Sequence, residues 1–326
     1  MLKSLHIKNF RGFRDLTIEP LKRVNLITGQ NNTGKTGVLE ALTLLLDDQT
    51  QTFRANLPNL FRIAGGDLGE NYWKWLFYNK SQTNNLEIRA SFQAEADFAI
   101  ILRGSQAPIN FHPAEFGAAG QIGGVPYLLT MGKAHAGHKP AIFSTHPSNP
   151  IQDAIDYNRV ILKRRKKQVE KLLREIEPRL EALEPLQTGQ SAQSSSPIIY
   201  ADLGLSEMIP VTQLGQGFNR LLDIYSEIVA ADAKVLLIDE IENGLHHSVL
   251  PVIWKGLFLA AKEFDVQIFA TTHSWECILA ADAAARTGEI YDLALIRLDR
   301  VKEDIKATVI DEKSLSTARE LQWEMR

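Results

Sequence analysis

The stretch GQNNTGKT, residues 29–36, decides the fold of this chain. An apolar run, VNLIT at 24–28, precedes it and predicts a strand. Apolar residues then recur at helical spacing: Val38, Leu39, Leu42, Leu45 and Leu46. A strand, a loop of the form G-x-x-x-x-G-K-[ST] and a helix in this order predict a P-loop. In such a loop the glycines let backbone N–H groups point at a phosphate, and the helix dipole adds positive potential.

The residue types of this loop suit the binding of a nucleoside triphosphate. Lys35 would neutralise the β and γ phosphates, and the hydroxyl of Thr36 would coordinate Mg²⁺. The predicted cofactor-binding residues of the loop are Gly29, Asn31, Asn32, Thr33, Gly34, Lys35, Thr36 and Gly37.

Bulk composition limits the class of protein. The chain has 326 residues, 44% hydrophobic and 23% charged, with a formal charge of −3, so any nucleic-acid surface must be local. A single cysteine, Cys277, excludes an internal disulfide and favours a reducing compartment. Uninterrupted apolar stretches stay shorter than the ~20 residues of a membrane helix. We therefore expect a cytoplasmic protein without a membrane span.

The N-terminal half contains strand patterns and one long helical pattern. Alternation on both sides of Arg11-Gly12 predicts two short antiparallel strands, and NLEIRASFQ with DFAIILRG predicts a hairpin. Residues 104–147, rich in Gly, Pro and His, are expected to be mostly loop. A charged helix is expected from Asp153 to Glu177. Its thin apolar stripe is typical of a packed hairpin or short coiled coil, and consists of Ile155, Leu162, Val169, Leu173 and Ile176.

The C-terminal half alternates strands and helices. The segments are PIIYADLG, GFNRLLDIYSEIVAA, KVLLID, VLPVIWKGLFLAAKEF and VQIFATTHS, followed by a terminal hairpin. This order predicts an α/β fold with a mixed, mainly parallel sheet, N-terminal antiparallel strands and a helical insertion. We expect a first lobe with the P-loop at 1–150, a helical insertion with a polar loop at 151–205, and a second lobe at 206–326.

KVLLIDEIENG at 234–244 supplies a second half of the site. Asp239 ends an apolar strand, where ligands bind in open α/β sheets, and its carboxylate would join Thr36 in holding Mg²⁺. Glu240 would orient or deprotonate the attacking water. The alternative is a strand followed by an exposed acidic turn, but the P-loop upstream favours the metal site.

Two further motifs follow the same order along the chain. QIFATTHS places His273 at the end of a buried strand, where it would either contact the γ-phosphate or attacking water, or cap the helix that begins at Ser274. LGQG at 214–217 precedes a helix, and its glycines would form either an anion-binding nest or a simple turn.

These motifs together resemble the head of an ABC-type ATPase, and with IKNFRGF at 7–13 they resemble the SMC, RecF and OLD-like group. The resemblance covers roughly residues 1–50 and 205–325. It implies a P-loop NTPase fold, slow Mg²⁺-dependent ATP hydrolysis and a homodimer that encloses two ATP molecules. The roles it implies in cis fall on Lys35, Thr36, Asp239, Glu240 and His273. Those in trans, on the partner's nucleotide, fall on Gly215, Gln216 and Gly217, and Arg11 would lie near the nucleotide.

The chain departs from the family pattern at three places. The usual Ser-Gly-Gly-Gln signature reads Gly-Gln-Gly-Phe at 215–218, so backbone N–H groups would replace the serine hydroxyl. His246 stands where an aspartate is usual, and His246 and His247 would either sense the opposite nucleotide or lie on the surface. The family's Q-loop glutamine is not assigned. Its candidates are Gln82, Gln93 and Gln106.

The resemblance also implies a function in which the head controls something else. OLD-like nucleases carry a TOPRIM domain with an Asp-x-Asp pair, and no such pair occurs here. We therefore expect a stand-alone head that controls a separate effector, a TOPRIM nuclease or a toxin, in phage defence or DNA repair. The alternative is a nucleotide-gated scaffold with incidental hydrolysis. A GTPase or small-molecule kinase is disfavoured, because the guanine-reading Asn-Lys-x-Asp motif does not occur.

Two clusters of charged or metal-binding residue types leave alternatives open. The cationic run at 163–167 would contact either DNA phosphates or only solvent. Four histidines lie in the glycine-rich segment without the spacing of a zinc site, so they are expected to be loop residues: His112, His135, His138 and His146.

Overall fold

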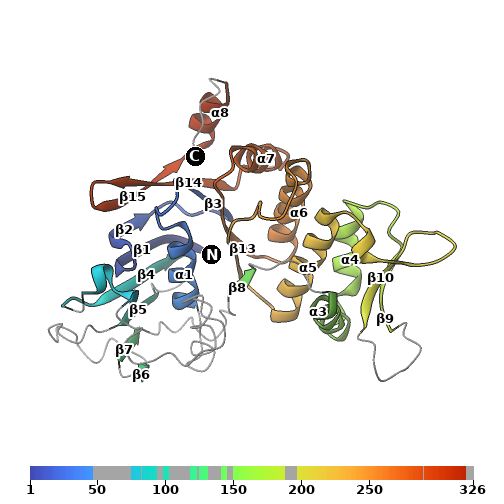
Figure 1. Cartoon of the computed structure of the whole chain (residues 1–326), viewed down its shortest axis with the longest axis horizontal. Coiled ribbons are helices and arrows are strands. Elements are labelled where there is room, and N and C mark those ends of the chain that lie inside the picture. The colour runs from blue at the N-terminus through green and yellow to red at the C-terminus, as the bar shows by residue number, and fades with distance from the viewer. Residues whose placement is uncertain are drawn as a thin grey trace.

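The computed structural model (Figure 1) describes residues 1–46, 75–81, 83–93, 98–102, 118–122, 125–130, 141–144, 150–187, 197–288 and 290–320. Its central sheet has the strand order β15-β14-β3-β13-β12-β8, and only β15 is antiparallel to its neighbour. The strands are β3 (Val24–Thr28), β8 (Ala141–Ser144), β12 (Val235–Ile238), β13 (Gln267–Thr271), β14 (Leu293–Val301) and β15 (Asp304–Ile310). The predicted mixed, mainly parallel sheet and the terminal hairpin are confirmed.

Helices cover both faces of this sheet. They are α1 (Lys35–Leu46), α5 (Gln216–Ala231), α6 (Leu250–Glu263) and α7 (Trp275–Arg286), and α8 (Glu312–Glu320) follows the last strand. In β12, Leu236 and Ile238 enter the core shared with α5, α6 and α7, whereas Val235 and Leu237 enter the core shared with α1. Because both faces are buried, these strands read as continuous apolar runs.

The second sheet is antiparallel and packs on α1. Its strand order is β2-β1-β4-β5-β7-β6. The strands are β1 (Leu2–Phe10), β2 (Phe13–Ile18), β4 (Leu86–Phe92), β5 (Phe98–Leu102), β6 (Ala118–Ile122) and β7 (Val125–Thr130). The turn at Arg11-Gly12 and the hairpin of β4 and β5 are as predicted. The expectation of loop at 104–147 was wrong in part, since β6, β7 and β8 lie there and β8 pairs with β12.

The single helix expected from Asp153 to Glu177 is two helices, α3 (Pro150–Leu162) and α4 (Lys166–Arg174). Between them Arg164 adopts a left-handed backbone with φ of 59°, and its N–H donates to Ile161 O at 2.9 Å. The expected apolar stripe is therefore broken: Val169 is buried, but Leu162 is 82% exposed. A small sheet, β11-β10-β9, lies beside these helices. Its strands are β9 (Ala182–Leu186), β10 (Ile198–Asp202) and β11 (Ile209–Pro210).

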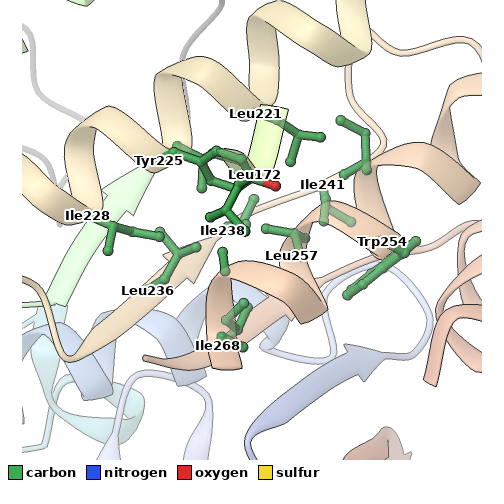
Figure 2. Packing of buried hydrophobic residues seen from close by; sticks show 14 of the residues in the cluster. Leu172, Leu221, Tyr225, Ile228, Leu236, Ile238, Ile241, Trp254, Leu257 and Ile268 are labelled. Atoms are coloured by element: carbon green, nitrogen blue, oxygen red, sulfur yellow. The ribbon is translucent and has the colours of Figure 1, made fainter. Parts of the chain in front are cut away.

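Helices α5 and α6 approach closely through a glycine. The hydroxyl of Tyr225 donates to Gly256 O at 2.9 Å, and a Cβ at Gly256 would lie 2.6 Å from Leu221 Cδ1. Figure 2 shows Leu221 and Tyr225 of α5 in the same core as Ile238 of β12 and Leu257 of α6. The packing of α5, whose first turn includes Gln216 and Gly217 of the LGQG segment, is therefore fixed by direct contact with α6.

Four carboxylates meet where α3 packs on α5. Asp153 and Asp156 of α3 are buried, and they face Asp223 and Glu227 of α5. Burial, with the charge of Asp153 second, raises the pKa of Asp223 to about 7. Burial, with the charge of Asp223 second, raises the pKa of Glu227 to about 8. The guanidinium of Arg220 opposes both increases in pKa, but it does not cancel them.

The remaining short elements are 3-10 helices: η2 (Tyr78–Lys80), η5 (Val211–Gln213) and η6 (His247–Val249). Among the described residues, no helix combines the length and apolar character that a bilayer span requires.

Candidate functional site

The P-loop joins β3 to α1, and its glycines are required by its geometry. Gly29 has φ of 142° and Gly34 has φ of 89°, values that residues with a side chain rarely adopt. A Cβ at Gly29 would lie 2.4 Å from Leu298 O, and one at Gly34 would lie 2.5 Å from the ring of Phe13. The loop is therefore held between β14 and β2, and only glycine fits at these two positions.

Lys35 turns back onto the loop that precedes it. Its Nζ donates to Gly29 O at 2.8 Å and to Gln30 O at 3.1 Å. Burial lowers the pKa of Lys35 from its ordinary 10.5, and the carboxylates of Glu240, Asp239 and Glu242 oppose that shift. The ammonium group thus lies at the mouth of the loop and within electrostatic reach of the acidic turn after β12.

Thr36 and Asp239 meet across the site. The hydroxyl of Thr36 donates to the carboxylate of Asp239, with distances of 3.0 Å to Oδ2 and 3.3 Å to Oδ1. Hydroxyl and carboxylate oxygens are the ligands that Mg²⁺ prefers, so these two residues fit the predicted metal.

A third residue, Thr271 at the end of β13, links the two acids after β12. Its hydroxyl donates to Asp239 Oδ1 at 2.6 Å and accepts from Glu240 N at 2.8 Å. Glu240 has a left-handed backbone with φ of 48°, so the chain turns sharply at this residue. The Glu240 side chain is exposed, as a residue that contacts water must be.

His273 is held by Glu242, which also follows β12. Glu242 Oε1 accepts from His273 N at 2.9 Å and lies 3.0 Å from His273 Nδ1. Ser274, not His273, caps α7: its Oγ accepts from Cys277 N at 3.1 Å. The capping alternative for His273 is therefore wrong, and its exposed ring stands beside the acidic turn.

Two arginines lie close to the P-loop elements. Arg300 of β14 donates from Nη2 to Asn32 O, at 2.9 Å, on the left-handed apex of the loop. Arg11 lies in the β1–β2 turn, where its Nε is 3.1 Å from Glu40 Oε2 of α1 and its N–H donates to Leu76 O. Its placement near the nucleotide stays a prediction.

The LGQG loop leads into α5 and makes local contacts. Gly215 is the N-cap of α5, and a Cβ there would meet open space. Asn219 Nδ2 donates to Leu214 O at 3.0 Å, and a Cβ at Gly217 would lie 2.7 Å from Val249 Cγ1. Gly215 and Gln216 are exposed. Among the described residues, no hydrogen bond joins this loop to the P-loop of the same chain, and its predicted action in trans stays a prediction.

The other sequence candidates fall into two groups. His246 and His247 are exposed with ring centroids 4.1 Å apart, and Gln93 follows β4. Outside the described residues lie Gln82, Gln106, His112, His135, His138 and His146. Within the described residues, no group of three or more metal-binding side chains is arranged to hold an ion.

Thr271, Glu242 and Arg300 are site residues that sequence reasoning missed. Thr271 lies in QIFATTHS and Glu242 lies in KVLLIDEIENG, but these motifs by themselves indicate no role for either position. Arg300 lies far from the P-loop in sequence, and only the pairing of β14 with β3 brings it there.

The P-loop, the acidic pair and the histidine follow β3, β12 and β13, which are neighbours in the order β3-β13-β12. Ligands bind at the carboxyl ends of such strands. This arrangement defines a nucleotide-hydrolysing head of the ABC type.

Comparisons with known proteins agree with that class. A family model described as "AAA domain" matches residues 4–119, and one described as "AAA domain, putative AbiEii toxin, Type IV TA system" matches residues 131–278. An "ATP/GTP phosphatase" of Helicobacter pylori is 23% identical over 88% of this chain and 89% of its own length. A "DNA replication and repair protein RecF" of Teredinibacter turnerae is 29% identical over 28% of this chain and 26% of its own.

The solved structure of an "SmcHead bound to the C-winged helix domain of ScpA" has the same fold. Its TM-score is 0.57 at 14% identity, covering 97% of this chain and 99% of that one. The chain therefore has the fold of an SMC head, and the two AAA-domain matches and the phosphatase relative support ATP hydrolysis as its activity.

Proposed function

We propose that two copies of this chain close around two ATP molecules with Mg²⁺, and that this closure controls a separate effector. Lys35 and the loop amides would bind the β and γ phosphates, and Thr36 and Asp239 would hold Mg²⁺, which supplies charge neutralisation when bound. Glu240 would orient the attacking water, and His273 would contact the γ-phosphate or that water. Hydrolysis would then weaken the contact between the two copies.

The observation that carries this proposal is the separation of the two halves of the site within one chain. The predicted catalytic Glu240, the P-loop and His273 follow strands that are neighbours in the sheet. Gly215 and Gln216 of the LGQG loop are exposed at the start of α5, and Asn219 Nδ2 donates to Leu214 O and Gly215 O within the same segment. A second copy would bring this start of α5 to the bound phosphates, which favours dimerisation because ATP then binds the closed state better than the open one.

Light scattering coupled to size exclusion, with ATP and Mg²⁺, tests the proposal. Glu240→Gln should bind ATP but hydrolyse it slowly, and so accumulate as a dimer. Lys35→Ala should stay monomeric under the same conditions. A Glu240→Gln protein that remains monomeric with saturating ATP would overturn the dimer.

The effector is proposed to be a separate TOPRIM nuclease or toxin that acts in phage defence or DNA repair. The matching family description mentions a type IV toxin–antitoxin system, one relative is RecF, and the SMC head was solved with part of another protein, ScpA. These likenesses support a controlling role for the head. If hydrolysis is essential, Glu240→Gln should abolish protection in cells. If the head is a nucleotide-gated scaffold instead, Glu240→Gln should keep protection and Lys35→Ala should lose it.

DNA remains the candidate partner of the cationic run at 163–167. Lys163 forms an ion pair with Asp232 at 2.7 Å, and Lys166 forms one with Glu184. The other three cations, Arg164, Arg165 and Lys167, are exposed and form no ion pair with a described residue. If DNA binds here, replacing these three by glutamine should weaken binding and flatten its salt dependence. Unchanged binding would exclude this surface.

A further inference from the structure

Glu242 holds His273 at two points with one oxygen. Its Oε1 lies 2.9 Å from the backbone N of His273 and 3.0 Å from the ring Nδ1. The backbone contact fixes where the chain leaves β13, and the ring contact fixes how the imidazole is turned. One carboxylate oxygen therefore determines both the position and the rotation of the histidine.

The carboxylate of Glu242 lies in an environment that is unfavourable for a charged group. The Glu242 side chain is only 12% exposed, and its Oε2 is buried without a hydrogen-bond partner among the described residues. A buried carboxylate oxygen without a partner is unfavourable, and such groups in a folded protein need an explanation. Glu242 also lies close enough to Lys35 to act on it electrostatically, which places it at the nucleotide site.

The contact also sets which ring nitrogen of His273 carries the proton. A carboxylate oxygen only accepts hydrogen bonds, so the partner Nδ1 must donate. In the neutral ring, Nε2 is then left as an acceptor, and in the protonated ring Nε2 becomes a donor. Either form directs Nε2 away from Glu242, available to the attacking water or to a phosphate oxygen.

We propose that Glu242 is a positioning residue of ATP hydrolysis, which holds His273 in the Nδ1-protonated form with Nε2 available to the nucleotide. The proposal rests on the role of His273 in the proposed function. A purely structural tether between the two loops is the competing explanation. The two differ in whether the effect of removing Glu242 passes through the imidazole.

A double-mutant cycle separates these explanations. Glu242→Ala should lower kcat about 10–100-fold, the usual effect of losing a group that orients a catalytic side chain, while KM for ATP changes less than about twofold. In a His273→Ala background the same substitution should change kcat less than about twofold, because the group that it positions is absent. Glu242→Gln, which keeps an oxygen acceptor, should recover part of the loss.

The control is Glu276→Ala, which removes an exposed carboxylate from the first turn of α7, hydrogen-bonded to Ser274 at 2.8 Å. It should leave kcat unchanged. An equal loss from Glu242→Ala in both backgrounds would show that Glu242 acts independently of His273, and would overturn the proposal. If Glu242→Ala fails to fold, Glu242→Gln takes its place in the same cycle. The proposal then requires that Glu242→Gln lower kcat less in the His273→Ala background than in the wild type.

Nitrogen-15 spectra of histidine-labelled protein give a readout besides activity. The His273 signal, identified by its loss in His273→Ala, should report an Nδ1-protonated ring in the wild type and a mixture of tautomers in Glu242→Ala. A wild-type ring protonated at Nε2 alone would refute the assignment. The spectrum is recorded without nucleotide and does not depend on dimerisation, so failure of the dimer and failure of the Glu242 role are distinguishable.

Discussion

Thr271→Val is the sharpest single test of how the acidic turn is built. Valine has nearly the shape of threonine but lacks the hydroxyl, and Thr271 is fully buried, so the change removes interactions without opening a cavity. Two hydrogen bonds are lost: the one donated to Asp239 Oδ1 at 2.6 Å, and the one accepted from Glu240 N at 2.8 Å. The second helps to hold Glu240 in its left-handed conformation.

The expected magnitude follows from the kind of each bond. A hydrogen bond to a charged carboxylate contributes about 1.5–3 kcal/mol, and one to a backbone amide about 1 kcal/mol. Thr271→Val should therefore lower the free energy of unfolding by about 2–4 kcal/mol. Because Asp239 loses one of the hydroxyl groups that orient its carboxylate, the Mg²⁺ concentration for half-maximal ATPase activity should rise about 10–100-fold.

Urea unfolding and a Mg²⁺ titration of ATPase activity measure the two effects, with Thr271→Ser as the matched control that keeps the hydroxyl. The serine variant should stay close to wild type in the Mg²⁺ titration. If the valine and serine variants had the same Mg²⁺ requirement, the bridge from Thr271 to Asp239 would have no part in metal binding, and the reasoning would be refuted.

Three further expectations concern separate parts of the molecule. Since burial raises the pKa of Asp223 from 3.8 to about 7, the folded state binds more protons than the unfolded state between these values. Stability should thus fall as pH rises from about 4 to about 7, and Asp223→Asn should flatten that urea-midpoint profile. Gly256→Ala should destabilise by about 1–3 kcal/mol in urea unfolding despite alanine's helix preference, because its Cβ would overlap Leu221. Arg300→Gln should raise KM for ATP several-fold, because the hydrogen bond to Asn32 O at the P-loop apex is lost. Arg297→Gln, whose side chain pairs with Asp299 among the described residues, should leave KM unchanged; equal KM values for the two variants would exclude a role of Arg300 at the apex.

The sheet was predictable because its strands are buried on both faces. VLLI and QIFAT are too apolar and too short for amphipathic helices, and the P-loop pattern fixes the strand before it and the helix after it. The break between α3 and α4 was not predictable. The left-handed residue at this turn is Arg164, and arginine seldom adopts φ above zero. The sequence has no glycine or asparagine there that would indicate the end of a helix. Tertiary contact supplies the reason: the Nζ of Lys163 donates to Val229 O and Ala230 O at the end of α5, which ties the turn to that helix.

The sequence predicts the site residues that lie next to a strand, and it does not predict those beyond the turn at Glu240. Asp239 directly follows Ile238, the last residue of β12, so strand alternation still places it correctly. At Glu240 the backbone turns left-handed, and the alternation no longer tells which side of the sheet the next residues face. Glu242 therefore reads in sequence as one more exposed acid, although its carboxylate is brought back to the chain after β13. The same turn exposes Glu240 and leaves Glu242 largely covered, so a single backbone conformation separates the acid predicted to meet water from the acid that holds the histidine.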